Sequence, residues 1–279
     1  MAVAIMAVVG TLSGCGAAQR HRAGHGFDAA LGFWTRNRLL GALPWRGVPV
    51  LPRPTPTART RRASLQTSKV GAIFSTGSGG NHFCTASVVA SPKRDLLITA
   101  AHCISAGKNG GYQKNIVFIP GYRNGTAPHG VWTPRQLFVA PQWVSSSDPD
   151  YDVGFVVLNS RGGQNIQDVL GANRLNFNPG YRTLVRVTGY PNSADAPVAC
   201  RNWTAEQSPT QLRFDCAGLY DGTSGSPFVA GFDPLTGTGT IIGVVGGYQG
   251  GGDTDSVSYS SYLGTAGIQQ LYRQAVAAG

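Results

Sequence analysis

A serine in a glycine-rich turn is the residue of this sequence best placed to do chemistry. Ser224 lies in the segment 221–227, Asp-Gly-Thr-Ser-Gly-Ser-Pro, between Gly222 and Gly225. Flanking glycines allow a tight turn that lifts one hydroxyl from the surface and lets another molecule approach the backbone. Such a turn suits a serine nucleophile beside an oxyanion-binding site. In a chain with 39 glycines, the turn by itself is more typical of a surface loop.

Two apolar segments supply the residues that would activate this serine. His102 follows the run 97–101, Leu-Ile-Thr-Ala-Ala, and precedes Cys103. Asp152 opens a second run at 153–158, Val-Gly-Phe-Val-Val-Leu. The chain therefore contains a base, an acid to orient it and a nucleophile, in the order His, Asp, Ser.

Three aspartates compete for the orienting role. Asp148 and Asp150 flank a proline, a context typical of turns. Asp152 directly precedes the apolar run, where a carboxylate can be buried against an imidazole N–H. There it would fix the histidine tautomer and stabilise the imidazolium, so we predict that Asp152 is the orienting acid.

These blocks resemble the trypsin/chymotrypsin-fold serine endopeptidases, most closely the secreted bacterial branch that includes the glutamyl endopeptidases. The resemblance covers roughly residues 69–279. It rests on Thr-Ala-Ala-His-Cys at 99–103, on Gly-Thr-Ser-Gly-Ser-Pro at 222–227, and on the aspartate with its apolar run at 152–158.

The resemblance assigns a role to each reactive group. It implies that Ser224, and not Ser226 in the same turn, is the nucleophile, and that His102 is the general base oriented by Asp152. It also implies an oxyanion hole formed by the backbone N–H groups of Gly222 and Ser224.

The resemblance also locates a substrate pocket. The residues it implies are Gly218, Leu219, Val245, Gly246 and Gly247. Gly218 stands six residues before the serine, where trypsin-like members carry the aspartate that selects Arg or Lys. Val245 or its neighbours replace the histidine of glutamyl endopeptidases. We therefore expect an uncharged side chain at P1, the substrate residue whose carbonyl is attacked.

Short apolar segments separated by Gly, Asn and Pro predict an all-β fold. They form two sets, before and after about residue 165: 70–74, 82–89, 96–100, 115–120 and 132–140, then 183–189, 211–215, 228–230, 240–245 and 257–262. The resemblance implies two six-stranded antiparallel β-barrels with the active site between them. Apolar residues on one helical face of 267–276 predict a C-terminal helix.

Four of the five cysteines form two local pairs, which indicates two disulfides and an oxidising compartment. Buried free thiols are the alternative. The resemblance favours Cys84–Cys103, because the family bridges the strand before the histidine to the residue after it. That pairing leaves Cys200–Cys216.

The fifth cysteine belongs to a leader. Residues 1–15 fit a signal peptide, whose apolar run is too short to span a bilayer and which lacks a positive first region. The sequence Leu-Ser-Gly-Cys at 12–15 resembles a lipoprotein box. Cys15 is therefore either lipidated, which would anchor the protein to the cell surface, or close to an ordinary cleavage site.

Residues 16–62 are rich in arginine and proline and show little periodicity. This composition favours an extended chain over a core. We interpret the segment as a pro-segment or linker with processing near Arg62, or as a plain disordered extension. The protease domain then spans 63–279.

The net charge of +10 is concentrated before that domain. Residues 1–62 contain nine arginines and one aspartate, 9 − 1 = +8, whereas residues 63–279 contain 14 Lys/Arg and 12 Asp/Glu, 14 − 12 = +2. A nucleic-acid-binding face needs clustered Lys/Arg on a folded domain, so nucleic acid is not expected as a partner. Asp253 and Asp255 are too few for a good calcium site, so we expect no metal and no cofactor.

The sequence thus predicts a secreted, monomeric serine endopeptidase that cleaves proteins or peptides through an acyl-enzyme. Two alternatives stay open. One is a catalytically silent, protease-like binding protein, and the other is an esterase-like serine hydrolase.

Overall fold

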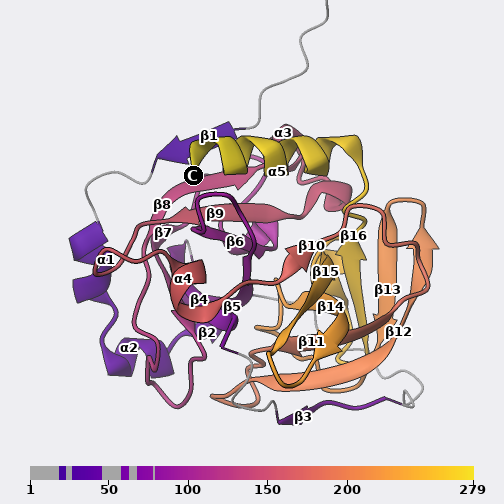
Figure 1. Cartoon of the computed structure of the whole chain (residues 1–279), viewed down its shortest axis with the longest axis horizontal. Coiled ribbons are helices and arrows are strands. Elements are labelled where there is room, and N and C mark those ends of the chain that lie inside the picture. Colours follow the sequence, from indigo (N-terminus) through magenta and orange to yellow (C-terminus); the bar gives the residue numbers. More distant parts are fainter. Residues whose placement is uncertain (1–18, 23–26, 46–57, 63–67, 78) are drawn as a thin grey trace, which may run out of the picture.

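The computed structural model describes residues 19–22, 27–45, 58–62, 68–77 and 79–279. In the first half of the chain, eight strands form one sheet (Figure 1). Their order is β1-β8-β9-β6-β5-β4-β7, with β2 paired to β5. Phe118 and Trp132 exchange backbone hydrogen bonds of 2.8 and 2.9 Å, which bring the β7 and β8 edges together. The bounds are Gln19–Arg22 (β1), Leu43–Pro44 (β2), Val70–Gly77 (β4), Gly80–Val89 (β5), Leu96–Thr99 (β6), Lys114–Pro120 (β7), Pro134–Val139 (β8) and Gly154–Leu158 (β9).

The second half forms another eight-stranded sheet, in the order β10-β15-β14-β11-β12-β13-β16, with β3 paired to β12. The bounds are Arg61–Arg62 (β3), Arg174–Leu175 (β10), Leu184–Gly189 (β11), Val198–Ser208 (β12), Gln211–Asp215 (β13), Pro227–Asp233 (β14), Thr238–Val244 (β15) and Val257–Ser261 (β16).

The two predicted six-stranded barrels are confirmed, and each gains two short strands. β4 to β9 build the first barrel and β11 to β16 the second. The additional strands are β10, which pairs in parallel with β15, and the three strands β1, β2 and β3 from the part of the chain before residue 63.

The C-terminal helix was also predicted correctly. α5 (Ala266–Ala278) buries Ile268, Leu271 and Ala275, which pack with apolar residues of β6, β8, β9, β14 and β15. Figure 1 shows α5 lying beside β8 and β9. Because this cluster contains residues of both barrels, the helix helps to hold the two barrels together.

Part of the segment interpreted as a linker is folded. α1 (Phe27–Phe33), α2 (Arg36–Leu40) and the connection between them bury Ala30, Leu39 and Trp34, respectively, against the outer face of β4 and β7. Both faces of β4 are consequently buried, since Ile73 points into the barrel while Ala72 and Phe74 meet the helices. Composition suggested an extended chain because the arginines and prolines outnumber these few apolar anchors.

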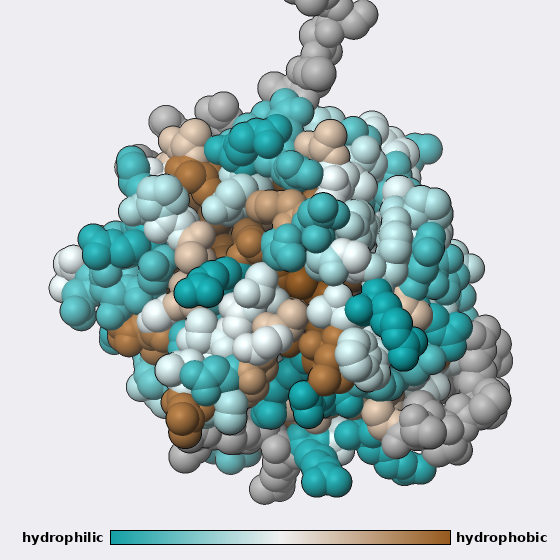
Figure 2. All heavy atoms as spheres, turned by 45° about the vertical axis from the view of Figure 1, so that its right-hand side comes forward, coloured by the Kyte–Doolittle hydropathy of each residue, from teal (hydrophilic) through white to brown (hydrophobic). Residues whose placement is uncertain are grey.

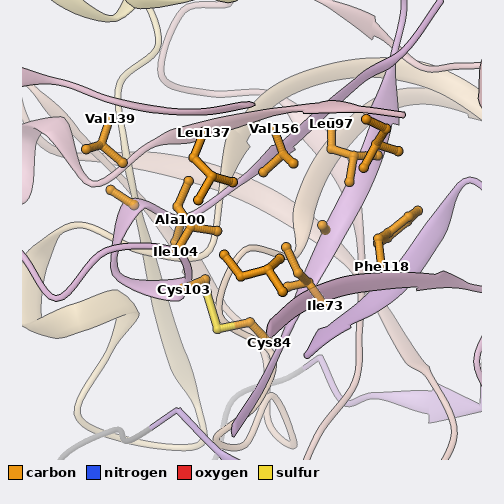
Figure 3. Packing of buried hydrophobic residues seen from close by; sticks show 14 of the residues in the cluster. Ile73, Cys84, Leu97, Ala100, Cys103, Ile104, Phe118, Leu137, Val139 and Val156 are labelled. Atoms are coloured by element: carbon orange, nitrogen blue, oxygen red, sulfur yellow. A yellow bond between two sulfur atoms is a disulfide. The ribbon is translucent and has the colours of Figure 1, made fainter. Parts of the chain in front are cut away.

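The first barrel is filled by aliphatic side chains around a disulfide. Ile73, Leu97, Leu137 and Val156 converge on the segment that carries Cys103 (Figure 3). On the face shown in Figure 2, hydrophobic residues appear only as small patches among hydrophilic ones. The remaining short helices are α3 (Pro141–Ser146), α4 (Ile166–Leu170), η2 (Ala101–Cys103), η3 (Pro149–Tyr151) and η4 (Tyr248–Gly251).

Candidate active site

The predicted base lies in a tightly packed turn at the end of β6. His102 is in η2 and is buried, between the fully buried Ala101 and the disulfide-bonded Cys103. The disulfide joins Cys103 to Cys84 on β5. Small neighbours and a covalent cross-link therefore fix the backbone that carries the imidazole.

Asp152 meets His102 from the turn between η3 and β9. Its Oδ2 lies 2.8 Å from His102 Nδ1 and accepts a hydrogen bond from the Gly247 N–H at 2.8 Å. Its Oδ1 accepts from the His102 backbone N–H at 2.9 Å. An ionised carboxylate only accepts hydrogen bonds, so Nδ1 carries the proton and Nε2 is the basic nitrogen.

The surroundings of Asp152 keep it ionised. Burial acts to raise the pKa of Asp152, but the facing imidazole and the three hydrogen bonds outweigh burial and leave this pKa below its ordinary value. Gly246 leaves room for the carboxylate, since a Cβ there would lie 3.0 Å from Oδ2.

The other two aspartates have structural partners. Asp148 accepts a hydrogen bond from the Asp150 N–H at 3.0 Å and so caps η3. Asp150 Oδ1 accepts from Gln211 Nε2 at 2.8 Å. Neither carboxylate takes part in the contacts of His102.

The serine turn packs against the segment just before His102. The Ser224 carbonyl accepts a hydrogen bond from the Thr85 N–H at 2.7 Å. A Cβ on Gly225 would clash with Thr85 O and Thr99 Oγ1 and lie 3.2 Å from the Ala100 nitrogen. The structure thus brings the turn beside β5 and β6, and Ser224 stays half-buried there. In the described part of the chain, no hydrogen bond joins its Oγ to His102.

Two N–H groups in this turn lack protein acceptors. Thr223 N donates to Tyr220 O at 3.1 Å and Gly225 N donates to Val245 O at 2.7 Å. The N–H groups of Gly222 and Ser224, the predicted oxyanion donors, have no acceptor within the described residues. Gly222 has φ +95°, a conformation that favours glycine.

Ser226 differs from its neighbour in the same turn. Its side chain is fully buried, and its Oγ has no hydrogen-bond partner among the described residues. A substrate carbonyl has no access to a hydroxyl in this position.

Thr85 supports the turn in a way that the sequence did not reveal. Its Oγ1 donates to the Gly222 carbonyl at 3.2 Å and accepts from the Tyr190 N–H at 3.0 Å. The hydroxyl therefore ties β5 of the first barrel to two loops of the second half. A threonine within a strand gives no local signal for such a contact.

A pocket beside Ser224 contains part of the predicted substrate site. Leu219 and Val245 line it together with the buried Ser258. Gly218 lies outside the lining, with its N–H donating to Asp255 O at 2.8 Å. Gly246 and Gly247 lie instead against Asp152.

The same pocket is acidic, whereas the pocket residues named from the resemblance are all uncharged. Asp221, Asp253 and Asp255 line it, and no Lys, Arg or His does. We call it the acidic pocket. The glycine-rich loop that follows β15 carries Asp253 and Asp255 back toward the serine turn, a path that sequence distance conceals.

Both predicted disulfides are present, Cys84–Cys103 and Cys200–Cys216.

Among the described residues, the one cluster of His, Cys, Asp and Glu side chains compact enough for a metal consists of His102 and the disulfide-bonded Cys84 and Cys103. Asp253 Oδ2 accepts a hydrogen bond from Gln249 Nε2 at 2.7 Å.

The chain matches the family model for trypsin over residues 59–263. It resembles the crystal structure of the protease Anisep from Arthrobacter nicotinovorans, at 30% identity and a TM-score of 0.69, covering 77% of this chain and 99% of that one. It also resembles the thermostable serine protease AL20 from an extremophilic microorganism, at 27% identity and a TM-score of 0.70, covering 77% and 100%.

Two more distant similarities were found. A Glu endopeptidase structure shares the fold at 16% identity and a TM-score of 0.61, covering 80% of this chain and 99% of that one. An extracellular metalloprotease of Bacillus subtilis (strain 168) is 26% identical over 97 residues, 35% of this chain, and the match spans only 30% of that relative. The family match, the two barrels and the bacterial protease structures show that the chain belongs to the trypsin family of serine endopeptidases.

Proposed function

We propose that this protein hydrolyses peptide bonds with Ser224 as nucleophile, His102 as general base and Asp152 as orienting acid. The observation that carries the proposal is the carboxylate of Asp152, which is held by His102 Nδ1, by the His102 N–H and by Gly247. This arrangement directs the basic Nε2 away from the acid. The serine turn packed beside residues 99–100 supplies the nucleophile.

In the first half of the reaction, Nε2 takes the Ser224 proton while Oγ bonds to the substrate carbonyl carbon. The oxygen that becomes negative accepts hydrogen bonds from the Gly222 and Ser224 N–H groups. The C–N bond then breaks, the imidazolium gives its proton to the leaving amine, and an acyl ester remains on Ser224. In the second half, His102 takes a proton from water, whose oxygen attacks the carbonyl carbon of the acyl ester. The bond from this carbon to Ser224 Oγ then breaks, Oγ takes the proton back from His102, and the carboxylic acid product leaves.

The acidic pocket points to the substrate. Three aspartates line the pocket that contains the nucleophile, and they favour a positively charged P1 side chain because opposite charges attract strongly in a partly desolvated site. We therefore propose peptides with Lys or Arg before the cleaved bond, in place of the uncharged residue that the sequence suggested.

Two disulfides support a location outside the cytoplasm, and secretion stays a proposal. Residues 1–18 lie outside the described residues, and with them the signal peptide and Cys15. Within the described residues, no helix combines the length and the apolar character needed to cross a membrane. The monomeric state and the anchoring through Cys15 likewise stay proposals.

Casein degradation by purified protein tests the proposal, with Ser224→Ala and Ser226→Ala as a matched pair. We expect degradation by the wild type and the Ser226 variant and none by the Ser224 variant. Reaction with a fluorophosphonate without proteolysis would favour an esterase, and absence of both would favour a silent binding protein.

A further inference from the structure

A second hollow, of about 320 Å³, lies beside the proposed active site. Its walls come from parts of the chain that are distant in sequence, among them β4 and Tyr122. Phe83 is on β5, Tyr190 and Asn192 follow β11, and Leu40 and Leu43 come from the N-terminal extension. Because most of its lining is aliphatic or aromatic, we call it the apolar hollow.

The apolar hollow borders the oxyanion turn. A Cβ on Gly222 would clash with the Phe83 ring and lie 2.6 Å from the Tyr190 carbonyl. Asn192 lines both the apolar hollow and the acidic pocket, and its N–H donates to Asp221 O at 2.7 Å. The two cavities therefore flank the turn that carries the nucleophile.

A covalent path also connects the hollow to the base. Phe83 precedes Cys84, whose disulfide partner Cys103 directly follows His102. The backbone of Phe83 is therefore connected to that of His102 through the Cys84–Cys103 disulfide and one peptide bond on each side of it.

The N-terminal extension is held in place as one wall of this hollow. β2 pairs in parallel with β5, with Leu43 opposite His82, and the Trp45 N–H donates to Phe83 O at 3.0 Å. Leu40 and Leu43 are nevertheless 43% and 60% exposed. Two leucines exposed at the edge of an apolar hollow indicate a surface that a binding partner would cover.

Described residues of the extension, Leu40 and Leu43 among them, line one side of the hollow. A substrate carbonyl bound at Gly222 and Ser224 places the acyl side in the pocket that contains Ser224. The leaving-group side must then continue across the turn, on the side of Phe83 and Tyr190. This step rests on the proposed function.

We propose that the apolar hollow binds an apolar side chain from the substrate segment that follows the cleaved bond, and that Leu40 and Leu43 determine this preference. The specificity of the enzyme is then set in part by residues 39–44, which lie outside the matched family domain at 59–263. The substrate class is a peptide with a basic residue before the bond and an apolar residue shortly after it.

Two kinds of substrate test this inference. One is an arginine anilide, which has no amino acid after the cleaved bond. The other is a pair of internally quenched peptides that share the acyl side and carry either Leu or Asp at each of the two positions after it. We expect the wild type to prefer the Leu peptide roughly tenfold in kcat/KM, a moderate effect for a hydrophobic pocket.

Leu43→Asp should abolish this preference, and its effect on anilide hydrolysis should be smaller than its effect on the Leu peptide. Leu31→Asp is the matched control, because Leu31 is a 46% exposed leucine of the same extension that does not line the hollow. It should leave both substrates unchanged, and thermal unfolding should confirm that both variants are folded.

Two results would overturn the inference: an unchanged Leu preference in Leu43→Asp, or an equal loss on the anilide and both peptides. Failure of the wild type to cleave the anilide at all would instead contradict the proposed function.

Discussion

His102 and Asp152 are joined twice, through Nδ1 to Oδ2 at 2.8 Å and through the backbone N–H to Oδ1 at 2.9 Å. The two contacts fix both the ring and the backbone of the histidine relative to a single carboxylate. Rotation of the imidazole away from the serine turn would break the first contact. The acid that makes this double attachment lies in the turn between η3 and β9.

The first prediction concerns the orienting acid. Asp152→Asn should lower kcat by about 10⁴, the loss known for this change in the trypsin-fold template, because the amide stabilises the wrong tautomer. Asp148→Asn and Asp150→Asn should change kcat less than threefold, roughly the scatter expected for a turn residue. Steady-state kinetics on one arginine substrate compares the three variants, and equal losses would contradict the assignment.

Asp152 should also make stability depend on pH. Its pKa in the folded protein lies below the ordinary value of 3.8, so the ionised form stabilises the fold above that value, and the contribution disappears as pH falls through the folded pKa. The difference in free energy of unfolding between the wild type and Asp152→Asn should be constant above about pH 5 and shrink at lower pH. Urea unfolding at several pH values measures it. A difference that grows on acidification would show that the carboxylate is not stabilised by its partners.

The disulfide next to His102 should matter for activity as well as stability. Replacing Cys84 and Cys103 by serine opens a loop with a sequence separation of 19 and should cost about 3 kcal/mol of unfolding free energy. The same change at Cys200 and Cys216, with a separation of 16, should cost about as much. Only the first pair should also lower kcat at temperatures where the protein stays folded, because only that pair holds the backbone of the base.

Charge in the acidic pocket should determine the P1 preference. Asp253→Asn and Asp255→Asn should each reduce kcat/KM for an arginine substrate about tenfold, the equivalent of about 1.5 kcal/mol for a hydrogen bond to a charged group. The ratio of arginine to leucine cleavage should fall with it. Asp233→Asn is the control, since that carboxylate lies at the end of β14 outside the pocket. An unchanged ratio in both pocket variants would refute the basic preference.

Local sequence patterns were sufficient to locate most of the strands, and the resemblance to the trypsin family implied their arrangement in two barrels. The strand ending before His102 and the strand opening after Asp152 are short, apolar and continuous, so their location follows from composition. The long strand β12 was not predicted, because Val198–Ser208 alternates irregularly between apolar, charged and polar residues. Pairing with β11 and β13 stabilises it as a strand.

Long-range contacts account for what the sequence did not reveal. Nothing in the sequence indicated that Asp253 and Asp255 line a pocket, because only the return of the chain after β15 places them beside Ser224. Trp34 and Leu39 are too few to predict a fold for the extension, yet they find a complementary surface on β4 and β7. In both cases the partner residue is more than twenty positions away.

The site of covalent modification by a fluorophosphonate tests the central claim most directly. Mass spectrometry of the labelled, digested protein should locate a single adduct on Ser224, and acid-denatured or Ser224→Ala protein should carry none. An adduct on Ser226 or on another serine, or full labelling of the Ser224→Ala variant, would contradict the account.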